Sequence, residues 1–147
     1  MGQTMEEGVG IYREEESMQK TIDTLKELQK RVKNVGLTDR GRVFNTEWMN
    51  LIELGYTLDV AQCMVHSAIN RKESRGSHQR LDGPNGAYRQ RDDENFLKHS
   101  LAFKVAGADE PEIKYSDVKI TTFQPAKRVY GAEADAAEAA KKAKEAK

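Results

Sequence analysis

Apolar residues recur at every third or fourth position between residues 18 and 35. This spacing places them on one face of a helix and leaves charged residues on the other face: Met18, Ile22, Leu25, Leu28, Val32 and Val35. Ser17 precedes the run, and its hydroxyl can accept a backbone N–H at the start of a helix. Gly36 follows the run and can adopt the left-handed conformation that ends many helices. The pattern therefore predicts an amphipathic helix over residues 18–35.

A longer helix is predicted from about Thr46 to Lys72, with Asn45 as its N-cap. Its apolar residues follow steps of three and four, the spacing of a packed helix pair: Leu51, Leu54, Leu58, Ala61, Val65 and Ala68. Four more apolar residues widen this stripe, so we expect the helix to be packed on more than one side. They are Trp48, Ile52, Met64 and Ile69. Gly55 costs about 1 kcal/mol relative to alanine inside a helix, so we expect a neighbouring helix to approach closely there.

Residues 2–12 indicate the last turns of a helix that stops at Gly8 and Gly10. Such a helix is short, and isolated helices of fewer than about 12 residues are marginal in water. We therefore expect the chain to begin inside an element. The predicted fold is mainly α, an up-and-down three-helix bundle whose first helix is only partly present.

The sequence changes character after Lys72. Residues 71–91 are rich in glycine and predict a loop, and residues 92–96 predict a short helical turn. Two strands are predicted over 99–105 and 113–122, and a phase slip near Asp117 could be a β-bulge. They form a small hairpin or extended arm. The tail, residues 131–147, has high helix propensity without an apolar stripe and predicts a frayed helix or disorder.

Composition narrows the functional class. The 147 residues carry 24 basic and 24 acidic side chains, so the formal net charge is zero, which argues against a strongly basic nucleic-acid binder. Cys63 is alone, which excludes an internal disulfide and fits a reducing compartment. No apolar run approaches the roughly 18 residues of a membrane span. These features predict a charge-rich intracellular domain without direct membrane insertion.

The neutral total hides one basic segment. Residues 71–91 contain six basic and two acidic residues, a local charge of +4. Arginines there could bind carboxylates or phosphates, Gly76 would allow close backbone approach, and His78 could titrate near neutral pH. A solvated loop is the plainer interpretation.

Cys63 and His66 share a helix face, but no second pair has zinc-ligand spacing, so packing is the better explanation. No glycine-rich phosphate loop or nucleophile motif is present.

Several strings resemble the C-terminal region of the fumarate reductase and succinate dehydrogenase flavoprotein subunit. They are MEEGVGIYR, FNTEWMNLIELGYTLDVAQCMVHSAINRKESRG, RKESRGSHQR, RDDENFLKHSLAF and YSDVKITTFQPAKRVYGAEA, and they run from Met1 to about Ala134. Where relatives commonly have a short stretch between Asp82 and Arg91, this chain has GPNGAYRQ. The resemblance implies a helical domain over residues 1–72, a basic loop and hairpin of the same domain over 73–130, and a tail over 131–147.

The resemblance also implies a parent enzyme that interconverts succinate and fumarate. Its electrons pass between FAD, iron–sulfur centres and quinone, on the cytoplasmic face of the inner membrane. The motifs that bind FAD and substrate in that family are absent from this chain, so we expect no cofactor, metal or catalytic residue here and no activity of the chain alone. We expect it to pack on the flavin and capping domains and the iron–sulfur subunit. The expected interface residues are Arg75, Gly76, His78, Arg80, Arg91, Asp92 and Asp93.

A second hypothesis is a free-standing helical adaptor. Its basic loop, residues 71–91, would bind an acidic protein or nucleic acid. Nucleic acid is the weaker option, because Tyr88 is the only aromatic residue in that loop and the whole chain is neutral.

Overall fold

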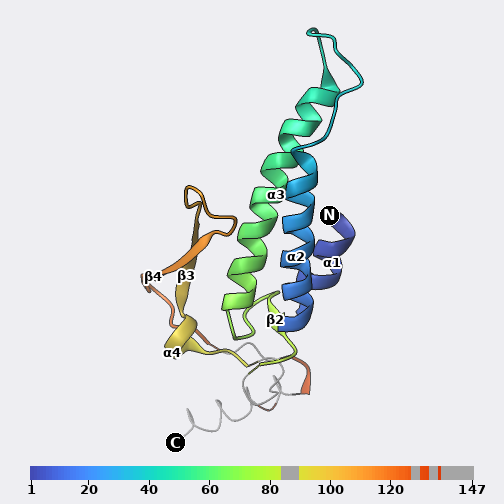
Figure 1. Ribbon diagram of the computed structural model, residues 1–147. Helices are drawn as coiled ribbons and strands as arrows, with labels where there is room; N and C mark the ends of the chain where they lie inside the picture. The colour runs from blue at the N-terminus through green and yellow to red at the C-terminus, as the bar shows by residue number, and fades with distance from the viewer. Residues whose placement is uncertain (84–89, 127–129, 133–135, 137–147) are drawn as a thin grey trace, which may run out of the picture.

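The computed structural model describes residues 1–83, 90–126, 130–132 and 136. Three helices pack side by side: α1 (Gly2–Val9), α2 (Glu15–Val32) and α3 (Thr46–Asn70). A β-hairpin of β3 (Lys98–Phe103) and β4 (Glu112–Asp117) lies on the other side of α3, and the upper part of α3 projects beyond it (Figure 1). The predicted mainly-α bundle with a small hairpin is confirmed. Within the described residues, no helix is long and apolar enough to cross a bilayer.

The core lies between α1, α2 and the C-terminal half of α3. Its buried members are Val9, Met18, Ile22, Leu25, Leu58, Ala61, Val65 and Ala68. The last four residues of the predicted α3 stripe are therefore buried, whereas Leu51 is only half-buried and Leu54 is exposed. α1 can lie close to α2 because Gly8 has no side chain. A Cβ atom there would come within 1.9 Å of Thr21 Oγ1.

The two long helices begin differently. α3 begins as predicted, because Asn45 Oδ1 accepts the backbone N–H of Trp48 at 2.8 Å. α2 begins at Glu15, two residues before the predicted cap, and the N-cap Glu14 makes no side-chain cap bond. The prediction that Ser17 caps α2 is therefore wrong. Gly36 is not left-handed either, since α2 ends in the right-handed conformation at Lys33.

Two short elements were not predicted. β1 (Tyr12–Arg13) pairs in parallel with β2 (Gln79–Arg80), so the segment predicted as a loop adds a strand beside the start of α2.

The predicted helical turn is confirmed as α4 (Asp93–Phe96), with Asp92 Oδ1 accepting Asn95 N–H. β4 ends at Asp117, so the phase slip there marks the end of the strand and not a bulge.

The hairpin contacts α3 but leaves much of its second packed side exposed. Five apolar residues at steps of four form a stripe that we name the α3 ridge: Trp48, Ile52, Tyr56, Val60 and Met64. Their exposed fractions are 41–68 %. Gly55 lies beside this ridge, and a Cβ atom added to it would meet no atom of the chain within 4 Å. The expected close neighbour of Gly55 is therefore not found. The predicted tail lies almost entirely outside the described residues.

Candidate functional site

Two of the predicted interface residues, Arg75 and Asp92, donate to Glu73, a carboxylate that is fully buried just after α3. Its Oε1 accepts bonds from Arg71 at 2.6 Å and Arg75 at 2.7 Å. Its Oε2 accepts from Arg75 at 3.0 Å and from the backbone N–H of Asp92 at 2.7 Å. One acidic side chain therefore joins the end of α3, the loop and the segment that returns to α4. We call this group the Glu73 network.

Arg80 faces the interior of the chain and is 1 % exposed. Its Nη1 donates to the carbonyl of Ile69 at 3.1 Å and more weakly to those of Ala68 and Arg71, at the C-terminal end of α3. Its Nε and Nη2 hold both carboxylate oxygens of Asp82, at 2.6 and 2.9 Å. Arg80 therefore works as a side-chain cap at the C-terminal end of α3.

Asp82 extends this contact to α2. Its Oδ2 accepts the backbone N–H of Glu15 at 2.6 Å, so it supplies the cap that Ser17 was expected to provide. Burial raises the pKa of Asp82, but the bonds from Arg80 and from Glu15 N–H outweigh burial and hold the pKa below its ordinary value. The Arg80–Asp82 pair thus joins the end of α3 to the start of α2.

His78 is buried between two arginines, and its contacts define its proton positions. Arg13 Nη1 lies 2.7 Å from Nδ1, and Nε2 lies 3.0 Å from the carbonyl oxygen of Arg71. A guanidinium can only donate, so Nδ1 accepts and Nε2 carries the single proton. Burial holds the pKa of His78 below its ordinary value, and the charges of Arg13 and Arg80 lower it further. His78 is therefore a neutral structural residue in this chain.

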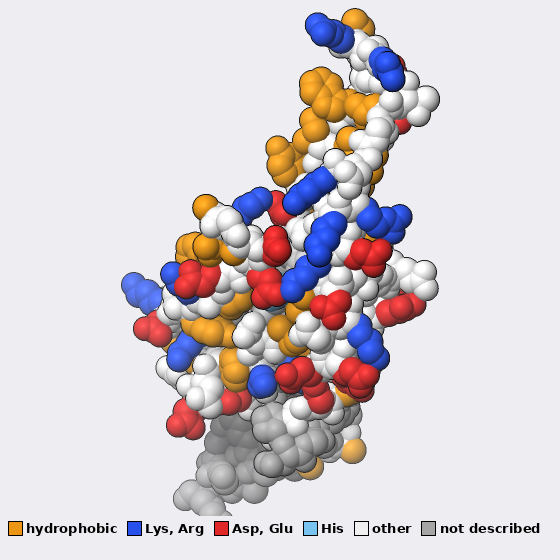
Figure 2. Space-filling view, viewed as in Figure 1, with side chains coloured by type: hydrophobic (Ala, Val, Ile, Leu, Met, Phe, Trp, Pro, Cys, Tyr) orange, Lys and Arg blue, Asp and Glu red, His pale blue; other side chains and the backbone are white. Residues whose placement is uncertain are grey.

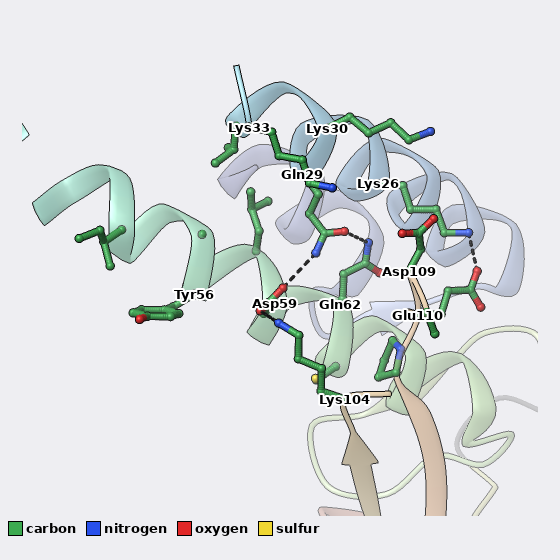
Figure 3. A pocket seen from close by; sticks show the side chains of 17 residues that line it. Lys26, Gln29, Lys30, Lys33, Tyr56, Asp59, Gln62, Lys104, Asp109 and Glu110 are labelled. Atoms are coloured by element: carbon green, nitrogen blue, oxygen red, sulfur yellow. Dashed lines mark hydrogen bonds and ion pairs between the residues drawn. The ribbon is translucent and has the colours of Figure 1, made fainter. Parts of the chain in front are cut away.

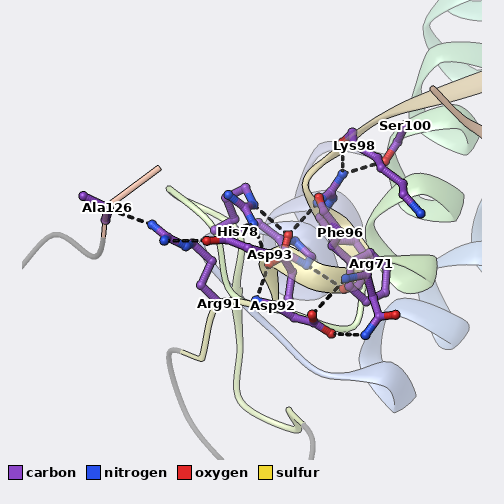
Figure 4. Close-up of polar contacts among 12 residues, drawn as sticks. Arg71, His78, Arg91, Asp92, Asp93, Phe96, Lys98, Ser100 and Ala126 are labelled. Carbon is purple, nitrogen blue, oxygen red and sulfur yellow. Dashed lines mark hydrogen bonds and ion pairs between the residues drawn. The ribbon is translucent and has the colours of Figure 1, made fainter. Parts of the chain in front are cut away.

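Arg91, Asp92 and Asp93 do order the return to α4. Asp93 accepts from Arg75 at 2.5 Å and from Arg91 at 2.6 Å, and the bond from Arg75 keeps the pKa of Asp93 low. Arg91 also donates to the carbonyl of Ala126, as Figure 4 shows. Gly76 has a φ of 59° in the tight turn closed by Arg75 and His78.

The charge of the basic loop is therefore largely satisfied by the loop itself. Arg71 and Arg75 share Glu73, Arg80 has Asp82, and Arg91 has Asp93. Guanidinium groups held in this way are poor ligands for an external anion, because binding would break existing charged bonds. This pairing does not favour the adaptor hypothesis. Arg89 and Tyr88 lie outside the described residues.

Arg71 has a larger role than its position in the loop suggested. Besides Glu73, it donates to the carbonyls of Phe96 and Lys98 and to Ser100 Oγ, at 2.7–3.0 Å (Figure 4). Its guanidinium carbon also lies 5.6 Å from the centre of the Phe96 ring. Arg71 therefore attaches the hairpin to the end of α3. Sequence reasoning missed this contact, because the bonded groups lie 25–29 residues away.

A cavity that the sequence did not reveal lies between α2, α3 and the loop that joins β3 to β4. Its volume is about 490 Å³, within the range of ligand pockets. Figure 3 shows a chain of hydrogen bonds along one wall, from Lys104 to Asp59, Gln29 and Gln62. Gln62 is 2 % exposed, and its Oε1 has no hydrogen-bond partner among the described residues. Gly55 lines the same cavity.

No group of three or more potential metal ligands occurs in the described part of the chain. His66 is buried, which lowers its pKa, and Cys63 is a free, half-buried cysteine. β1 and β2 are parallel, but each has only two residues and no glycine-rich turn joins a strand to a helix. The described residues therefore offer no dinucleotide-binding unit of the kind that holds FAD.

Comparison with known proteins agrees with this architecture. The chain is 63 % identical over 139 residues to the fumarate reductase flavoprotein subunit of a Serratia species, covering 94 % of this chain and 22 % of that protein. It is 61 % identical over 143 residues to the same subunit of Escherichia coli, covering 97 % of this chain and 23 % of that protein. A solved structure of E. coli quinol fumarate reductase matches 88 % of this chain and 21 % of its own, with a TM-score of 0.80 and 60 % identity.

The chain thus spans about a fifth of the length of the relatives it matches. Residues 1–130 match the protein family described as "Fumarate reductase flavoprotein C-term". From this match and the shared fold, we conclude that the chain belongs to the C-terminal domain family of fumarate reductase flavoproteins.

Proposed function

We propose that this chain is the C-terminal structural domain of a flavoprotein subunit that interconverts fumarate and succinate. In that subunit, FAD exchanges electrons with iron–sulfur centres and, through them, with quinone. The observation that carries the proposal is identity of 61–63 % to fumarate reductase flavoprotein subunits over nearly the whole chain. Charged networks at the start of α2 and the end of α3 suit a domain that holds its own shape while other domains perform the chemistry.

The chain alone is proposed to be inactive. Hydride transfer belongs to the flavin, and the protein's part is to bind and orient it. The described arginines of the basic loop are already bonded to Glu73, Asp82 and Asp93. The contribution of this chain is therefore to stabilise the assembled subunit, which packs against an iron–sulfur subunit on the cytoplasmic face of the inner membrane.

The exposed side of the basic loop is one proposed contact with the flavin domain. Arg75 and Arg91 keep 29 % and 26 % of their side chains exposed, and Asp93 keeps 36 %. Arg80 and His78 are buried beneath these residues and attach the loop to the rest of the fold. This division gives these five predicted interface residues a role without requiring a buried arginine to leave its partners.

A chimera tests the proposal. The C-terminal region of the Serratia flavoprotein subunit that this chain matches is replaced by the chain, and the chimera is produced with the other subunits of that enzyme. We expect bound FAD and fumarate reduction by a chemically reduced dye. The isolated chain, mixed with FAD and filtered, should retain none. Stoichiometric FAD on the isolated chain, or a folded chimera without fumarate reduction, would contradict the proposal.

A further inference from the structure

The α3 ridge is an apolar surface that the described residues leave uncovered. Its five residues are at least 41 % exposed, and Val43 and Phe44 of the preceding loop are each 90 % exposed. Figure 2 shows hydrophobic side chains gathered along the free upper part of α3. Three of these seven residues are aromatic and can each bury about 150–250 Å². The patch therefore reaches the several hundred Å² that marks an interaction surface.

The loop before α3 is ordered even though it holds apolar side chains in water. The Glu47 carboxylate accepts the backbone N–H groups of Thr38 and Asp39, at 3.0 and 2.7 Å. Asn45 Nδ2 donates to the carbonyls of Asp39 and Gly41, both at 2.9 Å. Phe44 is held at a φ of 53°, a conformation that non-glycine residues rarely adopt. The loop thus presents Phe44 in a fixed position, as a prepared binding surface does.

The cavity beside the ridge holds a buried hydrogen-bond acceptor that lacks a donor among the described residues. Ile52, Gly55 and Tyr56 line it together with Gln62, so ridge and cavity form one continuous surface. Gln62 Oε1 is buried there and finds no donor in the described part of the chain. Gly55 leaves an open space where a second polypeptide could come close to the α3 backbone. Such a pocket is suited to a large side chain that carries an N–H or O–H donor.

We propose that the α3 ridge, the loop at Phe44 and the cavity at Gly55 form the main docking surface for the preceding part of the flavoprotein subunit. This inference rests on the proposed function. The partner surface is apolar and inserts one donor-bearing side chain, such as Tyr, Trp or Arg, that bonds Gln62 Oε1. The relatives are more than four times as long as the stretch matched here, so ample chain is available to cover the surface.

A second copy of the chain fits the surface less well. The ridge covers 16 residue steps, or about 24 Å along the helix. Two identical helices whose four-step ridges interlock cross at about 50° and separate within a few turns. Such a crossing at Tyr56 would leave both ends of the ridge and Phe44 exposed to water. A partner that follows the whole length of α3 covers them all.

The test compares the isolated chain with the chimera described above. Val60→Cys is placed on the ridge, and Gln19→Cys on the exposed face of α2 serves as the matched control. Each is labelled with a maleimide, and the modified site is identified by peptide mass spectrometry. We expect Val60→Cys to react at least about tenfold more slowly in the chimera than in the isolated chain, because docking buries it, and Gln19→Cys to react alike in both. A chimera that reduces fumarate but leaves Val60→Cys fully reactive overturns the inference and leaves the proposed function intact.

A second variant separates docking from folding. A Cβ atom added at Gly55 meets no atom of this chain within 4 Å, and the cavity has room for the rest of the Gly55→Leu side chain, so the isolated variant should unfold at a temperature no lower than that of the parent chain. In the chimera the leucine fills the cavity, and we expect labelling of Val60→Cys to rise by at least about tenfold because the partner is displaced. Asn50→Leu adds the same side chain to α3 outside the ridge and cavity and should change neither result. Equal effects of Gly55→Leu and Asn50→Leu on the labelling of Val60→Cys would contradict the inference. Sedimentation experiments that show a second copy of the chain bound at the ridge would contradict it as well.

Discussion

Glu73→Gln is the substitution that tests the energetics of the basic loop most directly. Glutamine keeps the shape of the side chain but removes the charge and replaces one acceptor oxygen with an NH₂ group. Glu73 accepts four bonds, three from guanidinium groups and one from the backbone of Asp92. At least one of these donors would then face another donor, and two arginines would lose a buried counter-charge.

The size of the effect follows from burial. Removing one partner of a buried ion pair costs about 3–5 kcal/mol. Arg71 and Arg75 retain 15 % and 29 % exposure, and Arg75 keeps its bond to Asp93, so water and a second acid reduce the loss. We therefore expect a decrease of about 3 kcal/mol in the free energy of unfolding. In a chain of this length, that corresponds to a melting temperature lower by roughly 6–12 °C.

Urea denaturation followed by circular dichroism measures the loss, and hydrogen exchange locates it. The backbone N–H of Asp92 should exchange faster in the variant because its acceptor is altered. Glu16→Gln makes the same chemical change at a carboxylate that is 80 % exposed, and its unfolding midpoint should not move. A decrease below about 1 kcal/mol for Glu73→Gln, the value of one ordinary hydrogen bond, would refute this account of the network.

Four further outcomes follow from particular contacts. Asn45→Ala removes the N-cap of α3 and should lower the free energy of unfolding by about 1–2 kcal/mol in urea denaturation. Gly8→Ala places a methyl group within 1.9 Å of a hydroxyl oxygen on α2 and should destabilise the chain by about 1–3 kcal/mol, measured by thermal unfolding. Gly55→Ala meets open space and should instead stabilise the isolated chain by about 0.5–1 kcal/mol in the same assay. His78 has a folded pKa below its unfolded value near 6.5, so its contribution to stability is present above that pH and is lost as pH falls. Unfolding midpoints from pH 8 to 5 should therefore fall less steeply in His78→Gln than in the parent.

Local signals in the sequence predicted the elements whose determinants are local. The cap of α3 joins Asn45 to a residue three positions away, and the cap of α4 joins Asp92 to Asn95. The sequence predicted the Asn45 cap and the helical turn that begins after Asp92. The cap of α2 comes from Asp82, 67 residues after Glu15, and no pattern near Ser17 could reveal it. The same reason explains the missed β1–β2 pair and the attachment of the hairpin by Arg71.

The buried stripe of α3 was predictable only in part. Steps of three and four identify apolar residues that share a helix face, but they do not say which faces this chain covers. Leu58 and Val65 meet α1 and α2 and are buried, whereas Tyr56 and Val60 lie on the opposite side and are exposed. A helix that is apolar on all sides is built to be buried. The spacing therefore predicts a second packed side for α3, and the described hairpin covers only part of that side.

The basic segment of this domain is not the surface best suited to bind a partner, although the local charge of residues 71–91 suggests that it is. A local charge of +4 suggested that residues 71–91 bind a partner, yet Glu73, Asp82 and Asp93 neutralise most of its arginines within the fold. Breaking those bonds to bind an external anion would cost as much as the new contacts return. Covering the α3 ridge breaks no bond and releases ordered water from apolar surface. In the proposed docking, the free energy therefore comes mainly from the apolar α3 ridge, and the described arginines of the basic loop act mainly within the fold.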